Sequence, residues 1–422
     1  MTAEIVILNQ LGVALAADSA VTIGQSKVYN TANKLFALSK SQPVAIMVYG
    51  GASFMGIPWE TLVKVFRRKI VKDQALPKVK DYGEAFVEFL RSTPLVGSDH
   101  EEKFIRDICV YIHQKIIEEI TKRIASHLRT QPRISAKQVK AITRQTVVDA
   151  YEEWEKSEWI EGANEKTARS AAKKYRKLIV AIGSAVMEKL PTTKIDQAVL
   201  IKICSEAIFR KRFLGATSGI VIAGFGEDQI YPEMVSYMVV SRVAGLLKVR
   251  VDTGATINVK NRAVIRAFAQ REMVYTFMEG IDPNLQRVTS SYLQTAHKEV
   301  PGQLASVFGR PLTQAETDGV SQSLAKLVTD YEKRLKTLRA RSFVGPVIDA
   351  VCALPLGELA VMAETLVNLT SFKRKMTLTT ESVGGPIDVA VISKGDGLVW
   401  IKRKHYFQAD LNKQYFDHFS RT

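Results

Sequence analysis

The chain opens with TAEIVILNQLGVALAADSAVT (residues 2–22), in which two apolar runs flank the polar turn Asn9-Gln10-Leu11. Short apolar runs bounded by Asn, Gln and Gly are typical of β-strands. A third such run follows from Val44 to Tyr49. The sequence therefore predicts a β-sheet that begins almost at the second residue.

Two turns in this stretch would bring three polar residues together. A hairpin turn near residue 10 places Thr2 opposite Asp18, and a second turn near Gln25-Ser26 places Asp18 opposite Lys34. Directly opposed residues of an antiparallel pair project on the same face of the sheet. We therefore expect Thr2, Asp18 and Lys34 to converge at one level.

These three residues suit nucleophilic catalysis. A threonine hydroxyl needs a base to take its proton, and a free α-amino group, with a pKa of roughly 7.7–8.0, can be that base. Threonine is small enough for Met1 to be removed before it. Lys34 would favour the deprotonated hydroxyl, and Asp18 would keep Lys34 charged. Taken singly, such residues are far more often a chain end, a turn and a solvated side chain, and hairpin geometry alone does not favour the catalytic interpretation.

The segments GVALAADSAVT (residues 12–22) and NKLF (residues 33–36) resemble the N-terminus of proteasome β-subunits and of the HslV-type bacterial peptidase. In that family a catalytic threonine, an acid and a lysine occupy the spacing of Thr2, Asp18 and Lys34. The resemblance implies an α+β fold, a four-layer αββα sandwich of the N-terminal-nucleophile (Ntn) hydrolases. It also implies a threonine-type peptidase or amidohydrolase that works through a Thr2 acyl-enzyme.

The same resemblance assigns further roles by matching position. Gly50, at the end of the apolar run, is the candidate backbone donor of an oxyanion hole, with Gly51 a close second. Glu381 and Ser382 are the candidates that would support Thr2. The candidates for an apolar specificity pocket are Val21, Ala32, Phe36 and Val48.

The middle of the chain has a different pattern, with apolar residues at three- and four-residue spacing among charged ones, for example Ile105, Ile108 and Ile112. This pattern is typical of amphipathic helices. Strand signals return from about Gly219 to Val251. Further helices are predicted at about 261–278, 321–341 and 356–372, before a closing hairpin. The predicted organisation is a core of residues 2–57 plus 213–405, an all-α insertion at 58–212 and a C-terminal tail at 406–422.

The protein has 422 residues and a net charge of +16, which could indicate a nucleic-acid partner. Between Glu60 and Arg212 there are 31 Lys and Arg against 21 Asp and Glu, so the basic excess lies mostly in the predicted insertion. Acidic residues interleave with the basic ones, which favours solvated helix faces over nucleic-acid binding. The alternative to an enzyme is an inactive proteasome-like scaffold whose basic insertion binds a protein or nucleic-acid partner.

Other classes of site and location are disfavoured by the sequence. Cys109, Cys204 and Cys352 lie far apart, so no zinc site or disulfide framework is predicted, and we expect no metal and no cofactor. The N-terminus lacks signal-peptide features, and the longest apolar stretch, 344–367, contains acidic residues and prolines. We therefore expect a cytoplasmic protein with no membrane contact. The resemblance adds a peptide or polypeptide substrate and a homo-oligomer, and it allows an ATPase unfoldase as a further partner.

Overall fold

A computed structural model describes residues 3–23, 27–39, 41–70, 75–215, 217–377, 383–405 and 407–414. Helices and antiparallel sheets together confirm the α+β class, while the four-layer sandwich stays a prediction. The chain forms two compact units. Unit 1 comprises Met1–Leu35, Gln229–Glu233 and Ala255–Thr422, and unit 2 comprises Phe36–Asp228 and Met234–Gly254.

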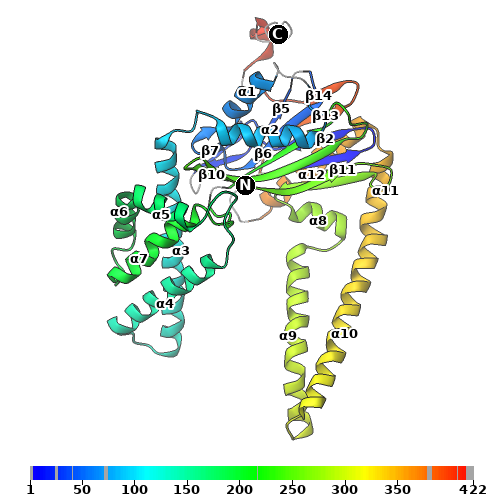
Figure 1. Cartoon of the computed structure of the whole chain (residues 1–422). Helices are drawn as coiled ribbons and strands as arrows, with labels where there is room; N and C mark the ends of the chain where they lie inside the picture. Colours follow the sequence, from blue (N-terminus) through cyan, green and yellow to red (C-terminus); the bar gives the residue numbers. More distant parts are fainter. Residues whose placement is uncertain are drawn as a thin grey trace. The chain divides into compact units, whose positions relative to one another are not determined.

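Unit 1 is built on a five-stranded sheet in the order β12–β1–β2–β13–β14 (Figure 1). Its central strands are buried throughout, and β1 is apolar apart from Glu4 and Asn9. The strands are β1 (Ala3–Asn9), β2 (Val13–Ala17), β12 (Ala263–Ala269), β13 (Asp388–Ser393) and β14 (Gly397–Lys402). A separate hairpin pairs β3 (Val21–Ile23) with β4 (Lys27–Tyr29).

The turn between β1 and β2 is held by Asn9. Its side-chain oxygen accepts hydrogen bonds from the amides of Leu11 and Gly12 at 2.9 and 3.2 Å. Asparagine side chains commonly stabilise turns in this way. A Cβ atom on Gly12 would lie 2.2 Å from the carbonyl oxygen of Ile392, so a glycine is required where β13 passes the turn.

The register of this hairpin differs by one residue from the predicted one. Glu4 faces Ala17, and the backbone amide of Asp18 donates to the carbonyl of Ala3 at 3.2 Å. Asp18 therefore lies opposite Ala3 rather than opposite residue 2. The turn places two residues between Asn9 and Gly12, which moves the centre of the hairpin by half a residue.

The predicted helix at 261–278 is wrong over its first half. Residues Ala263–Ala269 form strand β12, which pairs with β1 along its whole length, and only α8 (Glu272–Glu279) is helical. The apolar residues of the segment AVIRAFA fit both the period of a helix and the period of a strand. Pairing with the free edge of β1 decides for the strand, a choice that local propensity cannot make.

Helices pack on one face of the unit 1 sheet. Ala3, Ile5 and Ile7 of β1 share an apolar cluster with Leu359 and Leu366 of α12. Alternate strand residues face opposite sides, so Glu4, Val6 and Leu8 face away from this cluster. The helical segments here are η1 (Ala340–Val344), α11 (Gly345–Ala353) and α12 (Leu356–Lys375).

Two long helices of unit 1, α9 (Pro283–Phe308) and α10 (Gln314–Arg339), lie side by side as a hairpin (Figure 1). Asp282 caps α9 and Thr313 caps α10 by accepting hydrogen bonds from first-turn amides. Gly309, with φ of +63°, ends α9 in the left-handed conformation. None of the residues of α10 is buried.

Unit 2 contains the second five-stranded sheet, in the order β11–β10–β9–β6–β5. An apolar cluster joins it to helices α1 and α2, with the rings of Phe66 and Phe86 edge to face at a centroid distance of 4.9 Å. The elements are β5 (Leu35–Ala37), β6 (Val44–Gly50), β7 (Ser53–Phe54), β8 (Ile57–Pro58), β9 (Ser218–Gly224), β10 (Glu233–Val243), β11 (Leu246–Thr256), α1 (Trp59–Ile70) and α2 (Val79–Ser92).

A helical bundle forms the rest of unit 2 (Figure 1). Its own apolar cluster includes Ile105, Ile112, Ile179 and Leu200. The helices are α3 (Ser98–Thr130), α4 (Ala136–Glu155), α5 (Glu165–Lys174), α6 (Arg176–Val186) and α7 (Lys194–Ala207). Helices α1 to α7 thus occupy the span predicted to be helical, whereas the predicted domain boundaries stay a prediction.

None of the helices in the described ranges is both long enough and apolar enough to cross a membrane. The stretch 344–367, the longest apolar-looking segment of the sequence, belongs to η1, α11 and α12 of unit 1. Beyond β14 the structure describes only part of the predicted tail, including the short helix η2 (Ala409–Leu411).

Candidate active site

Asp18 and Lys34 form a buried ion pair in unit 1. Nζ of Lys34 lies 2.6 Å from Oδ1 of Asp18, and the two residues are 4% and 1% exposed. Asp18 directly follows β2 and Lys34 directly precedes β5, so two strand ends position them. A buried ion pair is stable only when its other polar atoms also find partners.

The Asp18 carboxylate meets that condition. Oδ1 also accepts the amide of Ala3 at 3.1 Å, and Oδ2 accepts the amides of Ala20 and Gly384 at 3.2 and 3.1 Å. These three bonds fix the position of the Asp18 carboxylate beside the beginning of β1.

Lys34 is subject to two opposing influences. Burial is the larger, and it lowers the pKa of Lys34 from its usual value, because an ammonium ion loses its hydration. The carboxyl groups of Asp18 and Glu4 raise that pKa in turn. The lysine is thus less strongly held in its charged form than one in water.

The second predicted pairing, Asp18 opposite Lys34, does not occur in the backbone. The amide of Ala32 donates to the carbonyl of Ser19 at 3.2 Å, and Val21 faces Tyr29 in the β3–β4 hairpin. The long side chain of Lys34 covers the remaining distance to Asp18. The structure therefore brings these two residues together as predicted from their spacing, through a different register.

A third segment closes the site. The carbonyl of Gly384 accepts the Ser19 amide at 3.1 Å, and the Ser19 hydroxyl donates to the carbonyl of Pro386. These residues lie just before β13. They tie the end of β2 to a part of the chain more than 360 residues later.

Glu4 is a site residue that the sequence interpretation missed. It is fully buried, and neither of its carboxyl oxygens has a hydrogen-bond partner among the described residues. Burial raises the pKa of Glu4 well above its usual value, Lys34 opposes that rise, and Asp18 adds to it. A single acid in the otherwise apolar run AEIVIL was the signal that could have identified it.

Gly50 and Gly51, the two oxyanion candidates, lie at the end of β6 in unit 2. Gly50 has φ of +82°, and a Cβ atom there would lie 2.4 Å from the carbonyl oxygen of Thr217, so this position needs glycine. The Gly51 amide already donates to the Thr217 carbonyl at 3.2 Å. Gly51 is therefore the less available donor of the two.

The other predicted site residues have different surroundings. Val21 and Ala32 of unit 1 are half-buried, whereas Phe36 and Val48 belong to the apolar cluster of the unit 2 sheet. Their role as a specificity pocket stays a prediction. Thr2, Glu381 and Ser382 lie outside the described residues, so their roles also stay predictions.

Within the described part of the chain, no group of three His, Cys, Asp or Glu side chains is placed to hold a metal ion. Cys109 and Cys204 are buried in the helical bundle, and Cys352 is half-buried in α11. The side-chain hydrogen bond with Cys109, together with burial, raises the pKa of Cys204 well above its usual value, which makes this thiol a poor ligand and a poor nucleophile.

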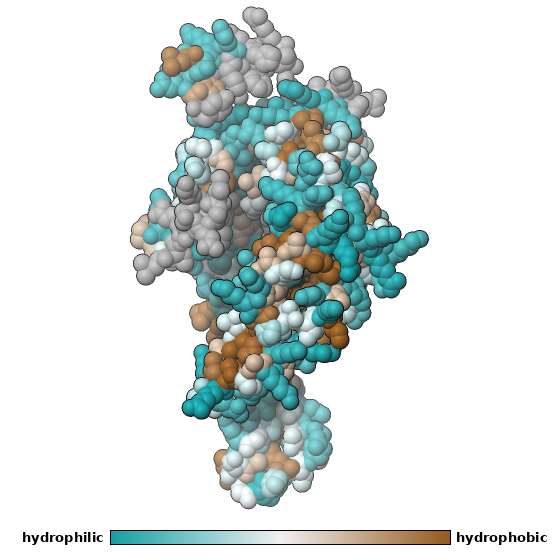
Figure 2. All heavy atoms as spheres, turned by 90° about the vertical axis from the view of Figure 1, so that its left-hand side faces the viewer, coloured by the Kyte–Doolittle hydropathy of each residue, from teal (hydrophilic) through white to brown (hydrophobic). Residues whose placement is uncertain are grey.

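The basic segments of unit 2 are partly neutralised by nearby acids. Arg212 pairs with Glu153 and Lys211 with Glu158, each at 2.8 Å. Figure 2 shows one face of the molecule, on which hydrophilic side chains cover most of the surface and hydrophobic ones form separate areas. These pairings favour solvated helix faces over a continuous basic surface for nucleic acid.

Comparisons with known proteins give no family match. No family model matches the chain, and no curated protein matches it. Similar solved structures include the Anbu complex from Pseudomonas aeruginosa in a helical assembly, at 9% identity and a TM-score of 0.33, covering 100% of this chain and 96% of that one. Another is Anbu, described as an ancestral β-subunit, from Yersinia bercovieri, at 8% identity and a TM-score of 0.26, covering 99% and 94%.

The assignment to the proteasome β-subunit and HslV-type family is therefore wrong. The similar structures are Anbu proteins, and no model of any family matches. The resemblance was carried mainly by the short segments 12–22 and 33–36, and motifs of this length do not establish a family on their own. At TM-scores of 0.33 and below, the likeness to Anbu carries no conclusion about family or activity either.

Proposed function

We propose that this protein is a threonine-type peptidase or amidohydrolase, with Thr2 as its nucleophile after removal of Met1. The observation that carries the proposal is the buried Asp18–Lys34 pair, whose carboxylate also binds the amide of Ala3. The Lys34 ammonium group is therefore held beside the beginning of β1, and Thr2 immediately precedes that strand in the sequence.

In the proposed reaction the Thr2 α-amino group takes the hydroxyl proton as Oγ attacks an amide carbonyl. The tetrahedral oxyanion would be stabilised by a backbone donor, for which Gly50 is the candidate. The protonated amine then gives its proton to the leaving nitrogen, which leaves an ester on Thr2. Water hydrolyses this ester by the same steps, releases the acid and restores the free hydroxyl.

Lys34 and Asp18 have separate tasks in this scheme. The Lys34 ammonium lowers the energy of the forming alkoxide and keeps the nearby amine neutral before attack. Asp18, fixed by three backbone amides, holds Lys34 in place and favours its charged form. The net charge of the Asp18–Lys34 pair is therefore close to zero.

Glu4 fits this arrangement only as a neutral acid. Burial raises the pKa of Glu4 well above its usual value and so favours the protonated acid, which does not compete with Asp18 for the lysine. An ionised Glu4 would add a second negative charge and disfavour the alkoxide. We therefore assign Glu4 a positioning role: it keeps a polar but uncharged group beside Lys34.

The proposal includes an arrangement and partners beyond the site. We propose that the two antiparallel sheets and their helices form a four-layer αββα sandwich, and that the protein acts as a homo-oligomer. The substrate would be a peptide with an apolar residue before the cleaved bond, contacted by Val21, Ala32, Phe36 and Val48. An ATPase unfoldase would be needed only for folded substrates.

The decisive experiment is the intact mass and the N-terminal sequence of the purified protein. We expect Thr2 to be N-terminal, an electrophilic boronate or β-lactone to modify Thr2, and a fluorogenic apolar peptide amide to be hydrolysed. Thr2→Ala should abolish hydrolysis, whereas Thr2→Ser, which keeps a hydroxyl and permits Met1 removal, should retain it. A retained Met1 in active protein would refute the mechanism.

A further inference from the structure

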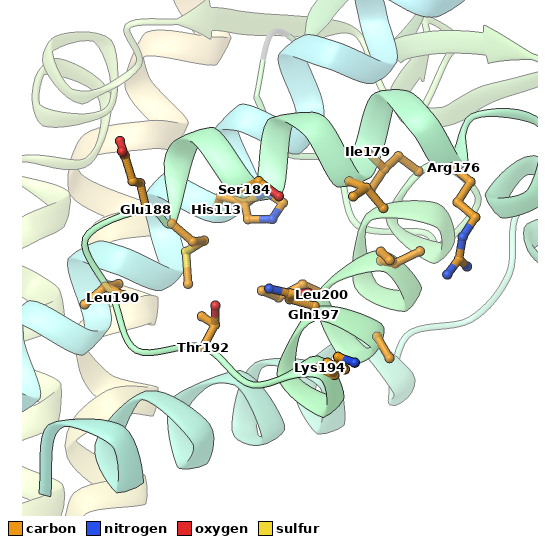
Figure 3. Close-up of a pocket in the computed structure, with 15 residues that line it drawn as sticks. His113, Arg176, Ile179, Ser184, Glu188, Leu190, Thr192, Lys194, Gln197 and Leu200 are labelled. Atoms are coloured by element: carbon orange, nitrogen blue, oxygen red, sulfur yellow. The ribbon is translucent and has the colours of Figure 1, made fainter. Parts of the chain in front are cut away.

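A cavity of about 520 Å³ lies within the helical bundle of unit 2, bordered by α3, α6, α7 and the segment joining α6 to α7 (Figure 3). Ile179, Met187 and Leu200 give it apolar walls, and the buried side chain of His113 borders it. Small-molecule sites in proteins commonly enclose about 300–1,000 Å³ and combine apolar walls with a few polar groups. The cavity has the size and character of such a site.

His113 presents a hydrogen-bond acceptor to this cavity. Its Nδ1 lies 2.7 Å from the carbonyl oxygen of Cys109, and because a carbonyl only accepts, Nδ1 must carry the proton. Burial lowers the pKa of His113, which keeps the ring neutral. Nε2 therefore holds a free lone pair, and it has no hydrogen-bond partner in the part of the chain that the structure describes.

Gly183 makes this arrangement possible. It stands inside α6, where glycine costs helix stability relative to alanine. A Cβ atom at this position would lie 3.2 Å from Nε2 of His113. The missing side chain leaves room for the ring beside α6, in a cavity that Gly183 itself lines.

Cationic groups stand at the same cavity. Arg176 at the start of α6 and Lys194 at the start of α7 line it, both exposed, together with Glu188. Neither cation forms an ion pair with any described residue. Two cations against one carboxylate favour an anionic group, and the planar guanidinium of arginine suits a carboxylate.

We propose that this cavity binds a small hydroxylated carboxylic acid, whose hydroxyl donates to Nε2 of His113 and whose carboxylate contacts Arg176 and Lys194. The apolar part of the ligand would lie against Ile179, Met187 and Leu200. This site is separate from the proposed hydrolase chemistry, since all of its residues belong to the helical bundle.

The test uses three probes of nearly equal shape on the full-length protein. Calorimetry should give the tightest binding for 3-(4-hydroxyphenyl)propionate, with 3-phenylpropionate and 4-propylphenol each at least about fivefold weaker, because each lacks one polar contact. In ¹⁵N-histidine spectra, only the probes that carry the hydroxyl should shift the Nε2 resonance of His113. Equal affinities for the three probes, or no binding at millimolar concentration, would overturn the proposal.

Variants assign the two contacts separately. Arg176→Gln should weaken 3-(4-hydroxyphenyl)propionate about fivefold or more while leaving 4-propylphenol unchanged, because only the carboxylate contact is lost. Lys177→Gln removes a neighbouring exposed cation that does not line the cavity, and it should change neither affinity. An equal loss in both variants would show only a general effect of charge and refute the assigned contact.

Discussion

Each unit buries a lysine in its interior, and the two lysines have different partners. Lys34 of unit 1 meets the carboxylate of Asp18 at 2.6 Å. Lys248 of unit 2, on β11, donates to the carbonyl of Ala207, the last residue of α7, at 2.8 Å. Burial lowers the pKa of both, and that of Lys248 falls to about 7.

The difference between these two partners shows how a buried ion pair differs from a buried hydrogen bond of a neutral amine. A helix C-terminus offers only a partial negative charge, so Lys248 is stable in its neutral form and can serve as a hydrogen-bond donor without a counterion. Lys34 has a full counterion that is itself fixed by three amides. Of the two lysines, Lys34 is the one with a carboxylate partner that favours its ammonium form, which is the form that the proposed catalysis requires.

The largest expected effect comes from breaking the Lys34 pair. Asp18→Ala leaves a buried ammonium without its counterion, and removing one partner of a buried pair typically costs about 3–5 kcal/mol. We expect a loss of that size in the free energy of unfolding, measured with urea at neutral pH. The double variant Asp18→Leu with Lys34→Met should recover most of it, since no buried charge remains. A loss below about 1 kcal/mol for Asp18→Ala would contradict the assigned role of the pair.

The next effect is a dependence of stability on pH at Lys248. Between about pH 7 and the usual lysine pKa near 10.4, the unfolded chain holds a proton that the folded chain lacks. The free energy of unfolding should therefore rise with pH in this window, by at most about 1.4 kcal/mol per pH unit. Lys248→Met should remove this slope. Urea unfolding at several pH values measures it, and an identical slope in wild type and variant would refute the neutral form.

Glu4 should make the free energy of unfolding depend on pH with the opposite sign to Lys248. Its folded pKa is raised, so between about pH 4.3 and that raised value the folded chain holds a proton that the unfolded chain has lost. Wild-type stability should fall as pH rises through this window. Glu4→Leu should be more stable than wild type by about 1–3 kcal/mol near neutral pH, because an unpartnered buried polar group is removed.

The control for Glu4 is Glu4→Gln, which keeps the shape and polarity of the protonated acid. Glu4→Gln should remove the pH dependence of the free energy of unfolding that Glu4 causes, but it should increase that free energy by less than Glu4→Leu does. Thermal unfolding at about pH 4.5, close to the usual glutamate pKa, and at about pH 7.5, well above it, compares the three proteins. A Glu4→Leu protein that is less stable than wild type at both pH values would show that the carboxyl has a partner.

The smallest effect is expected for an exposed pair. Lys64 and Glu60 of α1 approach to 2.5 Å, but both side chains are solvated. Exposed pairs at this helical spacing contribute about 0.3–0.5 kcal/mol. Lys64→Ala should thus change the free energy of unfolding by no more than about 0.5 kcal/mol, in contrast with Asp18→Ala. A larger loss of unfolding free energy in Lys64→Ala would contradict the expectation that exposed ion pairs contribute less stability than buried ones.

Local sequence patterns predicted much of the candidate site. The apolar runs around Asn9 indicated the β1–β2 hairpin, and the spacing of Asp18 and Lys34 indicated their proximity. The register was wrong by one residue, because the length of a turn is decided by contacts such as the passage of β13 beside Gly12. The second predicted pairing, Asp18 opposite Lys34, also failed in the backbone, and the long side chain of Lys34 still reaches Asp18.

The α+β class, the helical character of α1 to α7 and the proximity of Asp18 and Lys34 could be predicted from the sequence, since they follow from periods and spacings within a few tens of residues. Four further features required the folded structure: 263–269 is a strand, Gly384 binds Asp18, Glu4 has no partner among the described residues, and His113 borders a cavity. They required it because burial and pairing depend on segments that are distant in the chain. The period of the apolar pattern is set by neighbours in the sequence, whereas the pKa of a buried side chain depends on its neighbours in space.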